Sequence, residues 1–191
     1  MVPDPEVRQS LHADVAEMET MITAILEEAR LRSTAAALQR QPTEMADLLK
    51  SVAEEFQNRP PGAVCGPSEP ATLMVDGDKM RTVLRNLIDN AVKHTPIGGP
   101  PVAVSLARDA AQIAIVVEDR GMGIAAEALP HLFEPFYRAD ASRSRKTGGF
   151  GLGLSICKAI IDAHQGQIRI HSEPGKGTRV TVTLPSAASH G

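Results

Sequence analysis

The chain has 191 residues, of which 42% are hydrophobic and 23% charged, with a formal net charge of −3. This composition is typical of an ordinary globular protein and supplies no bulk charge for binding nucleic acid or an anionic membrane surface. Aromatic residues make up only 3% of the chain, so few side chains can stack on single-stranded bases. We therefore expect no nucleic-acid partner.

Two cysteines lie far apart in different settings, Cys65 in a Pro/Gly-rich loop and Cys157 on an apolar helical segment. This arrangement predicts free thiols in a reducing compartment. The chain contains no apolar run long enough to span a membrane and no signal-peptide start. We therefore expect the chain as given to be soluble and cytoplasmic.

A heptad pattern near the N-terminus predicts a long helix from Leu11 to Arg32. A helix with this seam either packs on its own domain or pairs with other helices in a bundle or dimer, and about three heptads leave both interpretations open. The apolar residues of the seam are Leu11, Val15, Met18, Ile22, Ile25 and Ala29.

Four features follow before residue 76. Ser33 to Gln41 is polar and small, and predicts a joint between elements. Glu44 to Phe56 predicts a second amphipathic helix. Arg59 to Pro70 is rich in proline and glycine and predicts no regular structure, whereas Thr72 to Val75 predicts a short strand. The apolar face of the second helix consists of Met45, Leu48, Leu49, Val52 and Phe56.

Asp78 opens a strongly helical segment that reaches about His94. Beside its apolar stripe, Asn86, Asn90 and Lys93 fall together on a neighbouring face at spacings of four and three. Asparagine is a poor residue inside a helix because its amide competes for the backbone. Such a pair is commonly solvated surface, and the alternative is a functional site. The predicted stripe consists of Met80, Val83, Leu84, Leu87, Ile88 and Ala91.

A β-hairpin is predicted next, with strands at Val102 to Leu106 and Ile113 to Val117. Its second strand leads to Asp119 in an Asp-x-Gly-x-Gly sequence. Alone, this sequence commonly marks a tight turn.

A cationic loop then precedes a glycine cluster. Leu132 to Phe136 predicts an apolar anchor, and the residues after it carry four cations against one acid. The loop is either solvated or a lid that faces phosphate. Glycines at the start of the predicted helix Leu154 to His164 either bring backbone N–H groups to phosphate or act as a hinge. The cations are Arg138, Arg143, Arg145 and Lys146, the acid is Asp140, and the glycines are Gly148, Gly149, Gly151 and Gly153.

The C-terminal part predicts two strands, Gln167 to His171 and Thr178 to Leu184, joined by the turn Pro174 to Gly177. The last six residues, 186–191, are expected to be disordered.

Together these segments resemble the sequence boxes of bacterial two-component sensor histidine kinases. Five boxes in one order and spacing are far more specific than any one of them. RNLIDNAVKHTP (85–96) resembles the N box, EDRGMGI (118–124) the G1 box, LFEPFYR (132–138) the F box, GGFGLGLSI (148–156) the G2 box and GKGTRVTVTLP (175–185) the terminal Thr box. The resemblance covers roughly Met45 to Pro185.

The resemblance implies an α+β fold of the Bergerat ATPase type. This fold is a two-layer α/β sandwich with a mixed sheet and helices on one face, shared with gyrase, MutL-type repair proteins and heat-shock chaperones. The implied domains are a partial dimerisation helix and linker at 1–40, an ATP-binding kinase domain at 41–185 and a tail at 186–191.

The resemblance also implies a role for each box residue toward ATP and Mg²⁺. Asp119 would accept from the adenine amine, and a carboxylate there rejects guanine. Asn90 would supply an oxygen to Mg²⁺, supported by Asn86. Lys93, Arg138 and Arg143 would join Asn86 as the catalytic set that stabilises phosphoryl charge. The implied cofactor-binding set is Asn90, Lys93, His94, Asp119, Gly121, Gly123, Ile124, Phe136, Gly149, Gly151, Leu152, Gly153, Leu154 and Thr178. Phe133 and Phe136 would anchor the lid.

Two departures qualify the implied activity. In hydrolysing relatives a glutamate that activates water stands where Asn86 stands here, and an amide cannot act as a general base. This favours transfer to a protein nucleophile. None of the six histidines is followed by Glu or Asp, as the family's acceptor is. We therefore expect a fragment whose acceptor lies outside it and whose Leu11 to Arg32 helix is the second helix of a dimerisation hairpin.

The function implied is that of an ATP-dependent protein-histidine kinase. Its expected partners are the acceptor helix of the parent protein, a response regulator and a second copy in a parent homodimer. Any anchor in the inner membrane would belong to missing regions. Two alternatives are a non-catalytic ATP-binding partner-switch module and an ATP-driven clamp of the gyrase type. The clamp would require a glutamate in place of Asn86, and a transducer domain.

Overall fold

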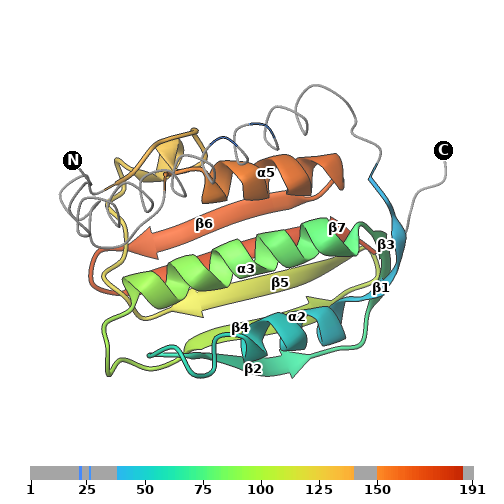
Figure 1. Cartoon of the computed structure of the whole chain (residues 1–191), viewed down its shortest axis with the longest axis horizontal. Coiled ribbons are helices and arrows are strands. Elements are labelled where there is room, and N and C mark those ends of the chain that lie inside the picture. The colour runs from blue at the N-terminus through green and yellow to red at the C-terminus, as the bar shows by residue number, and fades with distance from the viewer. Residues whose placement is uncertain (1–21, 23–25, 27–37, 140–149, 187–191) are drawn as a thin grey trace, which may run out of the picture.

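The described part of the chain folds into a sheet with helices on one of its faces (Figure 1). The computed structural model describes Ile22, Leu26 and residues 38–139 and 150–186. The elements are β1 (Gln41–Glu44), α2 (Met45–Glu54), β2 (Ala63–Ser68), β3 (Thr72–Val75), α3 (Gly77–His94), β4 (Val102–Arg108), β5 (Gln112–Asp119), a 3₁₀ turn (Leu129–His131), α5 (Gly153–Ala163), β6 (Gln167–Glu173) and β7 (Gly177–Pro185).

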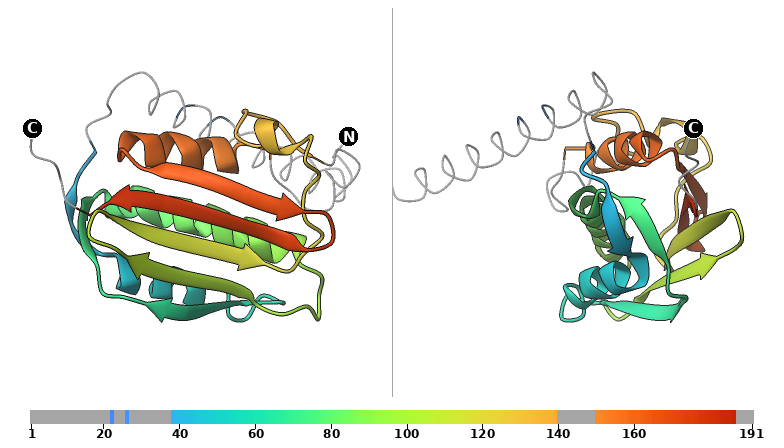
Figure 2. Two further views of the ribbon diagram at one scale, coloured as in Figure 1. Left: turned by 180° about the vertical axis from the view of Figure 1, so that it is seen from behind. Right: turned by 90° about the vertical axis from the view of Figure 1, so that its right-hand side faces the viewer.

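The main sheet has five strands in the order β2-β4-β5-β7-β6. β2 runs parallel to β4, and the other neighbours are antiparallel, so the sheet is mixed. Helices α2, α3 and α5 cover one face, and the view from behind shows the opposite face of the strands uncovered by them (Figure 2). The predicted two-layer α+β sandwich is therefore confirmed.

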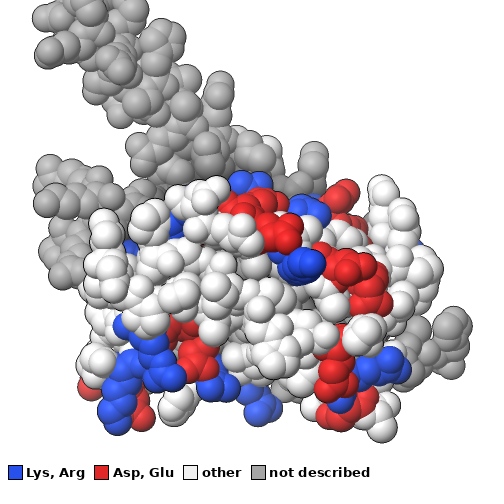
Figure 3. Space-filling model, turned by 90° about the horizontal axis from the view of Figure 1, so that it is seen from below, with Lys and Arg blue, Asp and Glu red and all other residues white. Residues whose placement is uncertain are grey.

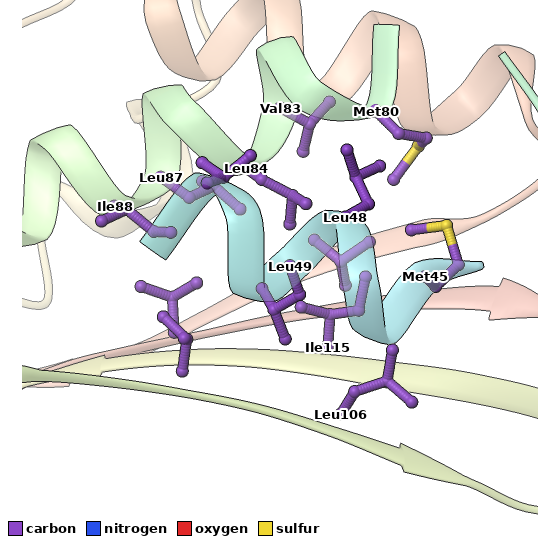
Figure 4. Packing of buried hydrophobic residues seen from close by; sticks show 14 of the residues in the cluster. Met45, Leu48, Leu49, Met80, Val83, Leu84, Leu87, Ile88, Leu106 and Ile115 are labelled. Carbon is purple, nitrogen blue, oxygen red and sulfur yellow. The ribbon is translucent and has the colours of Figure 1, made fainter. Parts of the chain in front are cut away.

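The hydrophobic core lies between the helices and the sheet. Every apolar residue predicted for the faces of α2 and α3 is buried. On β5, Ile113, Ile115 and Val117 point into the same core, as the period of two requires. Figure 4 shows Leu49 and Leu84 meeting above Ile115. Burying several such side chains, at about 1.5–3 kcal/mol each, is what makes the helical layer adhere to the sheet.

Two strands depart from the expectations. Gln41–Glu44 forms β1, which pairs antiparallel with β3, where a joint and a helix start were predicted. Ala63–Ser68 forms β2, so the prediction that Arg59 to Pro70 has no regular structure is wrong. Among the described strands β2 lies at the edge of the sheet and pairs only with β4, and its register shifts between Cys65 and Ser68. An edge position and an irregular register tolerate the proline in this strand, because its missing N–H is not needed there.

The joint before the sandwich is attached to it by polar contacts. The backbone N–H of Gln39 donates to Asp76 Oδ2 at 3.1 Å, and the Arg40 guanidinium donates to the Ala163 carbonyl at 3.1 Å. The buried ring of His164 lies between these contacts, with Nε2 accepting from the N–H of Asp76 at 3.0 Å. Residues 39 and 40, which we assigned to the linker, therefore contact the N-terminus of α3 and the C-terminus of α5.

Glu44 binds the helix α2 start to strand β3. Its Oε1 accepts from the N–H of Ala71 at 2.6 Å and of Ala46 at 3.3 Å, and Oε2 accepts from the Thr72 hydroxyl at 2.9 Å. The hydrogen bond from Ala71 is the main reason that the pKa of Glu44 lies below its usual value. Glu44 therefore caps α2 and secures the β1–β3 pair at the same time.

The predicted N-terminal seam lies almost entirely outside the described residues. Ile22 and Leu26 are helical, and each is about half exposed, at 54% and 53%. The predicted tail lies outside them too, except Ser186. Within the described residues, no helix is long and apolar enough to cross a membrane.

Both cysteines are free thiols, as predicted. Cys157 is buried on α5, whereas Cys65 is exposed on β2.

Candidate functional site

The predicted site residues that the structure describes gather at one end of the sandwich. The C-terminal end of α3, the end of β5, the N-terminus of α5 and the turn before β7 all lie at the left of Figure 1. The chain therefore brings together the N, G1 and Thr boxes and the described part of the G2 box, which lie between residues 85 and 185.

A polar row ends the core-facing side of the sheet. In the strand register, Asp119 pairs with Thr178, and Thr178 pairs with Ser172. Two residues back along the strands, the same face carries the apolar Val117 and Val180. Because side chains alternate along a strand, the polar row continues the apolar core directly. This places a carboxylate and two hydroxyls at the floor of the site.

Asp119 is buried and oriented by the backbone. Its Oδ1 accepts from the N–H of Gly121 at 2.7 Å and of Thr178 at 3.2 Å, while Oδ2 accepts no hydrogen bond from the described residues. Burial raises the pKa of Asp119 above its usual value, and these two donors offset part of the rise. One carboxylate oxygen is therefore held in place and the other is available to a ligand.

The glycines of the G1 box allow a close backbone approach. A Cβ on Gly121 would collide with the carbonyl oxygen of His94, and one on Gly123 with that of Glu173. Gly123 also has φ +67°, a conformation that other residues rarely adopt. These two glycines therefore let the turn after β5 lie against the end of α3 and the end of β6.

The face of α3 toward α5 carries the two asparagines, both half-buried. The Asn86 side chain lies 3.8 Å from where a Gly153 Cβ would stand. Burial raises the pKa of the Cys157 thiol to about 12, and a hydrogen bond from the Asn86 side chain offsets part of that rise. Asn86 is thus held beside the first residue of α5.

Lys93 lies on the same helix but is engaged in an ion pair. Its Nζ contacts Asp89 Oδ2 at 2.6 Å, and Asp89 Oδ1 contacts Arg59 at 3.0 Å. The Lys93 side chain is 33% exposed, so this pair contributes at most about 1 kcal/mol. A phosphate could therefore displace Asp89 from Lys93 at little cost.

The predicted apolar anchor of the lid, Leu132 to Phe136, contacts the core through fewer side chains than expected. Leu132 is buried and Phe133 packs against the core. Phe136 does not pack there: its side chain is 54% exposed and its φ is +66°. The role of Phe136 in anchoring the lid therefore stays a prediction. Its N–H donates to the Gly151 carbonyl at 3.1 Å, so the contact runs through the backbone.

The start of α5 has the geometry of an anion-binding terminus. The helix begins at Gly153, and its cap residue Leu152 supplies no side-chain hydrogen bond. Gly151 has φ +73°, and a Cβ there would lie 2.7 Å from the Tyr137 carbonyl oxygen. The first N–H groups of a helix favour phosphate oxygens. Leu154 lies in this turn, whereas Gly149 and Arg143 lie outside the described residues.

Two site residues escaped the sequence analysis. Ser172 is buried, and its hydroxyl links Ile124, Gly177 and Thr178. Cys157 is the neighbour of Asn86. A serine in a strand and a cysteine in an apolar helix carry no distinctive pattern. Their positions in register with Asp119 and next to Asn86 emerge only from the fold.

Charges in the described residues pair locally. On the face in Figure 3, acidic and basic side chains lie intermixed around a largely uncharged centre. Arg81 and Arg85, for example, both contact Glu55. Among the residues that the structure describes, no three His, Cys, Asp or Glu side chains gather as a metal site. The amides of Asn86 and Asn90 offer oxygen donors near the start of α5, a pair that fits Mg²⁺ shared with phosphates better than a protein cage.

Known proteins with similar sequences include sensor histidine kinases. Residues 75–188 match the family described as "Histidine kinase-, DNA gyrase B-, and HSP90-like ATPase". The chain is 37% identical over 174 residues to the adaptive-response sensory kinase SasA of Synechococcus sp. (strain JA-3-3Ab), covering 88% of this chain and 46% of that protein. It is 46% identical over 119 residues to the sensor-like histidine kinase SenX3 of Mycobacterium tuberculosis (strain ATCC 25618 / H37Rv), covering 61% of this chain and 29% of that protein.

A solved structure extends the likeness to nearly the whole chain. The crystal structure of full-length ShkA in complex with AMPPNP superimposes with a TM-score of 0.78 at 26% identity, covering 99% of this chain and 41% of that one. The chain spans less than half the length of each of these three proteins.

Proposed function

The chain belongs to the family of histidine kinase-, DNA gyrase B- and HSP90-like ATPases, and we propose that it is the catalytic, ATP-binding part of a two-component sensor histidine kinase. It transfers the γ-phosphate of ATP to a histidine on a dimerisation helix outside this chain. The observation that carries the proposal is Asn86 beside the N-terminus of α5. An amide at this position favours transfer over hydrolysis, because it cannot deprotonate water.

Adenine recognition follows from the shape and charge of the floor. Asp119 Oδ1 is engaged by two backbone donors, so Oδ2 is the atom that accepts from the 6-amino group. Guanine presents a carbonyl oxygen at that place, and a carboxylate repels it. Gly121 and Gly123 let the turn after β5 lie against the backbone of His94 and Glu173, and so define this end of the site. His94 and Ile124 belong to the same end of the site.

The phosphates extend from this floor toward α5. Asn90 supplies an amide oxygen to Mg²⁺, and Asn86, one helical turn earlier, supports it. The N–H groups at the start of α5 donate to phosphate oxygens. Lys93, released from Asp89, neutralises phosphoryl charge together with Arg138 and Arg143 of the lid.

The transfer itself requires positioning and charge stabilisation. The imidazole nitrogen of the acceptor forms a bond to the γ-phosphorus as the bond to the bridging oxygen breaks, and ADP leaves. Neutral imidazole has a free lone pair at pH 7, since its ordinary pKa is about 6.5. No strong base is therefore needed beside the nucleophile, which agrees with an amide at position 86.

The parent protein supplies the partners. We propose that it forms a homodimer through the dimerisation hairpin, to which the 11–32 segment belongs, and passes its phosphate to a response regulator. Ile22, a residue of the predicted seam, is 54% exposed and would be available to such a partner.

A phosphotransfer assay tests the proposal. The chain is incubated with γ-³²P-labelled Mg-ATP and the separately purified acceptor hairpin of the parent protein. We expect label on the hairpin, lost at least about 100-fold in Asn90→Ala, whose metal ligand is removed. Asn58→Ala, an exposed asparagine away from the site, is the matched control and should leave the rate unchanged.

Other outcomes of the same assay identify the alternatives. Sustained phosphate release without protein labelling would contradict the proposal and favour a clamp-type ATPase. Tight ATP binding with neither labelling nor release would favour a partner-switch module.

A further inference from the structure

We propose that Ser172 determines base specificity by making the hydroxyl of Thr178 a hydrogen-bond acceptor only. This inference deepens the proposed function and rests on it, because it assumes that ATP binds with its base at Asp119. Ser172 lies on β6, outside every box that we recognised in the sequence, and it is buried.

The hydrogen-bond geometry of Ser172 leaves one consistent arrangement. A hydroxyl has one proton to donate and two lone pairs to accept with. The carbonyl oxygen of Gly177, 2.8 Å away, can only accept, so it takes the Ser172 proton. The N–H of Ile124, at 2.9 Å, can only donate, so it uses one lone pair.

The remaining contact is with Thr178. Its Oγ1 lies 2.9 Å from Ser172 Oγ, and either atom could donate if the pair stood alone. Since the single proton of Ser172 is already engaged, Thr178 must be the donor. Its hydroxyl proton points at Ser172, and its lone pairs face away. Toward a ligand, the Thr178 hydroxyl can therefore only accept a hydrogen bond.

This acceptor lies beside a second one. Thr178 is in register with Asp119, and its N–H holds Asp119 Oδ1 in place. The two side-chain atoms left for a base are therefore Asp119 Oδ2 and Thr178 Oγ1, and both are acceptors. An exocyclic amine can donate to them, whereas the 6-carbonyl of hypoxanthine or guanine would meet only lone pairs. A threonine with a free hydroxyl could donate to that carbonyl and would weaken the discrimination.

The test compares ATP with inosine triphosphate, which carries a carbonyl in place of the 6-amino group. Dissociation constants are measured by calorimetry for the whole chain. The wild type should bind ATP at least about 100-fold more tightly than inosine triphosphate. In Ser172→Ala the Thr178 proton is released, so this preference should fall about 10-fold or more, with inosine triphosphate binding improved relative to ATP.

A second change separates specificity from packing. Adding Thr178→Val to Ser172→Ala removes the freed donor and should abolish the gain for inosine triphosphate. Thr178→Val alone removes an acceptor, so it should weaken ATP and leave inosine triphosphate no weaker. This single variant keeps the proposal testable even where Ser172→Ala does not fold. Thr181→Val, on the uncovered face of the same strand, is the control.

Equal weakening of both nucleotides in Ser172→Ala would show a purely structural role and overturn the proposal. So would a loss of inosine triphosphate affinity in Thr178→Val, because Thr178 would then be donating in the wild type. If the wild-type chain binds neither nucleotide, the proposed function itself fails. That result differs from one in which the wild type binds ATP and Ser172→Ala keeps the same preference for ATP over inosine triphosphate, which would contradict only the role of Ser172.

Discussion

At the scale of single residues, the site depends on side chains whose polar atoms are already committed to the backbone. Asp119 Oδ1 and the Ser172 hydroxyl both satisfy N–H groups of the loops around them. A ligand therefore meets groups with one orientation rather than flexible ones. Such preorganisation reduces the cost of ordering side chains on binding.

Asp119→Asn should weaken ATP binding about 10- to 100-fold. The loss corresponds to a charge-assisted hydrogen bond of roughly 1.5–3 kcal/mol, and the amide can also present an N–H to the 6-amino group. Titration calorimetry measures it. Asp109→Asn is a close control, because Asp109 Oδ1 likewise accepts two backbone N–H groups, at 2.8 Å each, in an exposed hairpin turn. Equal effects of the two variants would mean that Asp119 is only a turn residue.

At the scale of elements, the joint is as informative as the site. β1 pairs with β3, Asp76 caps α3 through the N–H of Lys79 at 3.1 Å, and His164 ends α5. The chain thus leaves the linker and at once contacts the two helices that carry the proposed phosphate-binding residues. This arrangement is a direct physical connection between residues 39–44 and the ends of α3 and α5.

The neutral ring of His164 makes this joint sensitive to acid. Nδ1 donates to the Ile160 carbonyl at 2.8 Å, so Nε2 is the acceptor for Asp76 N–H, and protonating it would break that hydrogen bond. Burial lowers the pKa of His164 below its usual 6.5, with a further contribution from Arg40. The neutral ring therefore makes its full contribution to the free energy of unfolding above pH 6.5. This contribution is lost as the pH falls toward the lowered pKa of His164 in the folded protein.

Urea unfolding between pH 7.5 and 5 should show this loss. One proton gives a slope of at most about 1.4 kcal/mol per pH unit in the free energy of unfolding. Subtracting the pH curve of His164→Gln isolates the contribution of His164. The raised pKa of Asp119 contributes a slope of opposite sign, but it does so equally in both proteins and cancels. A slope unaffected by His164→Gln would show that another group titrates.

At the scale of the whole molecule, the described residues form one sandwich whose core and site both lie after residue 40. All core residues fall between Met45 and Leu184. The segment from Leu38 to Glu44 adds β1, the Glu44 cap and the two joint contacts. The domain boundary is thus better defined by hydrogen bonds than by the core.

Two shortened chains test this boundary. A chain that starts at Leu38 should keep ATP affinity within about 2-fold and unfold with a similar free energy, since the core and joint remain. A chain that starts at Met45 should lose about 2–4 kcal/mol, because it lacks a helix cap and a strand pair. Thermal and urea unfolding measure both. Equal stability of the two would mean that β1 contributes nothing to the sandwich.

The sequence determined the elements whose pattern is local. The stripe on α3 and the alternation on β7 each follow from a period, and both appear where expected. The asparagine face of α3 and Asp119 were also identified, because their boxes are contiguous in sequence.

Only the tertiary structure decided the rest, because it depends on contacts between distant segments. β2 exists because β4 offers it an open edge, despite its proline and glycine. Phe136 is 54% exposed and contacts Gly151 through its backbone N–H, which no local pattern predicts. Ser172 acquired its place because two antiparallel pairings bring it into register with Thr178 and Asp119, 53 residues earlier in the chain. A local sequence pattern determines which face of a strand a side chain lies on. Which strand pairs beside it, and in which register, depends on the tertiary structure.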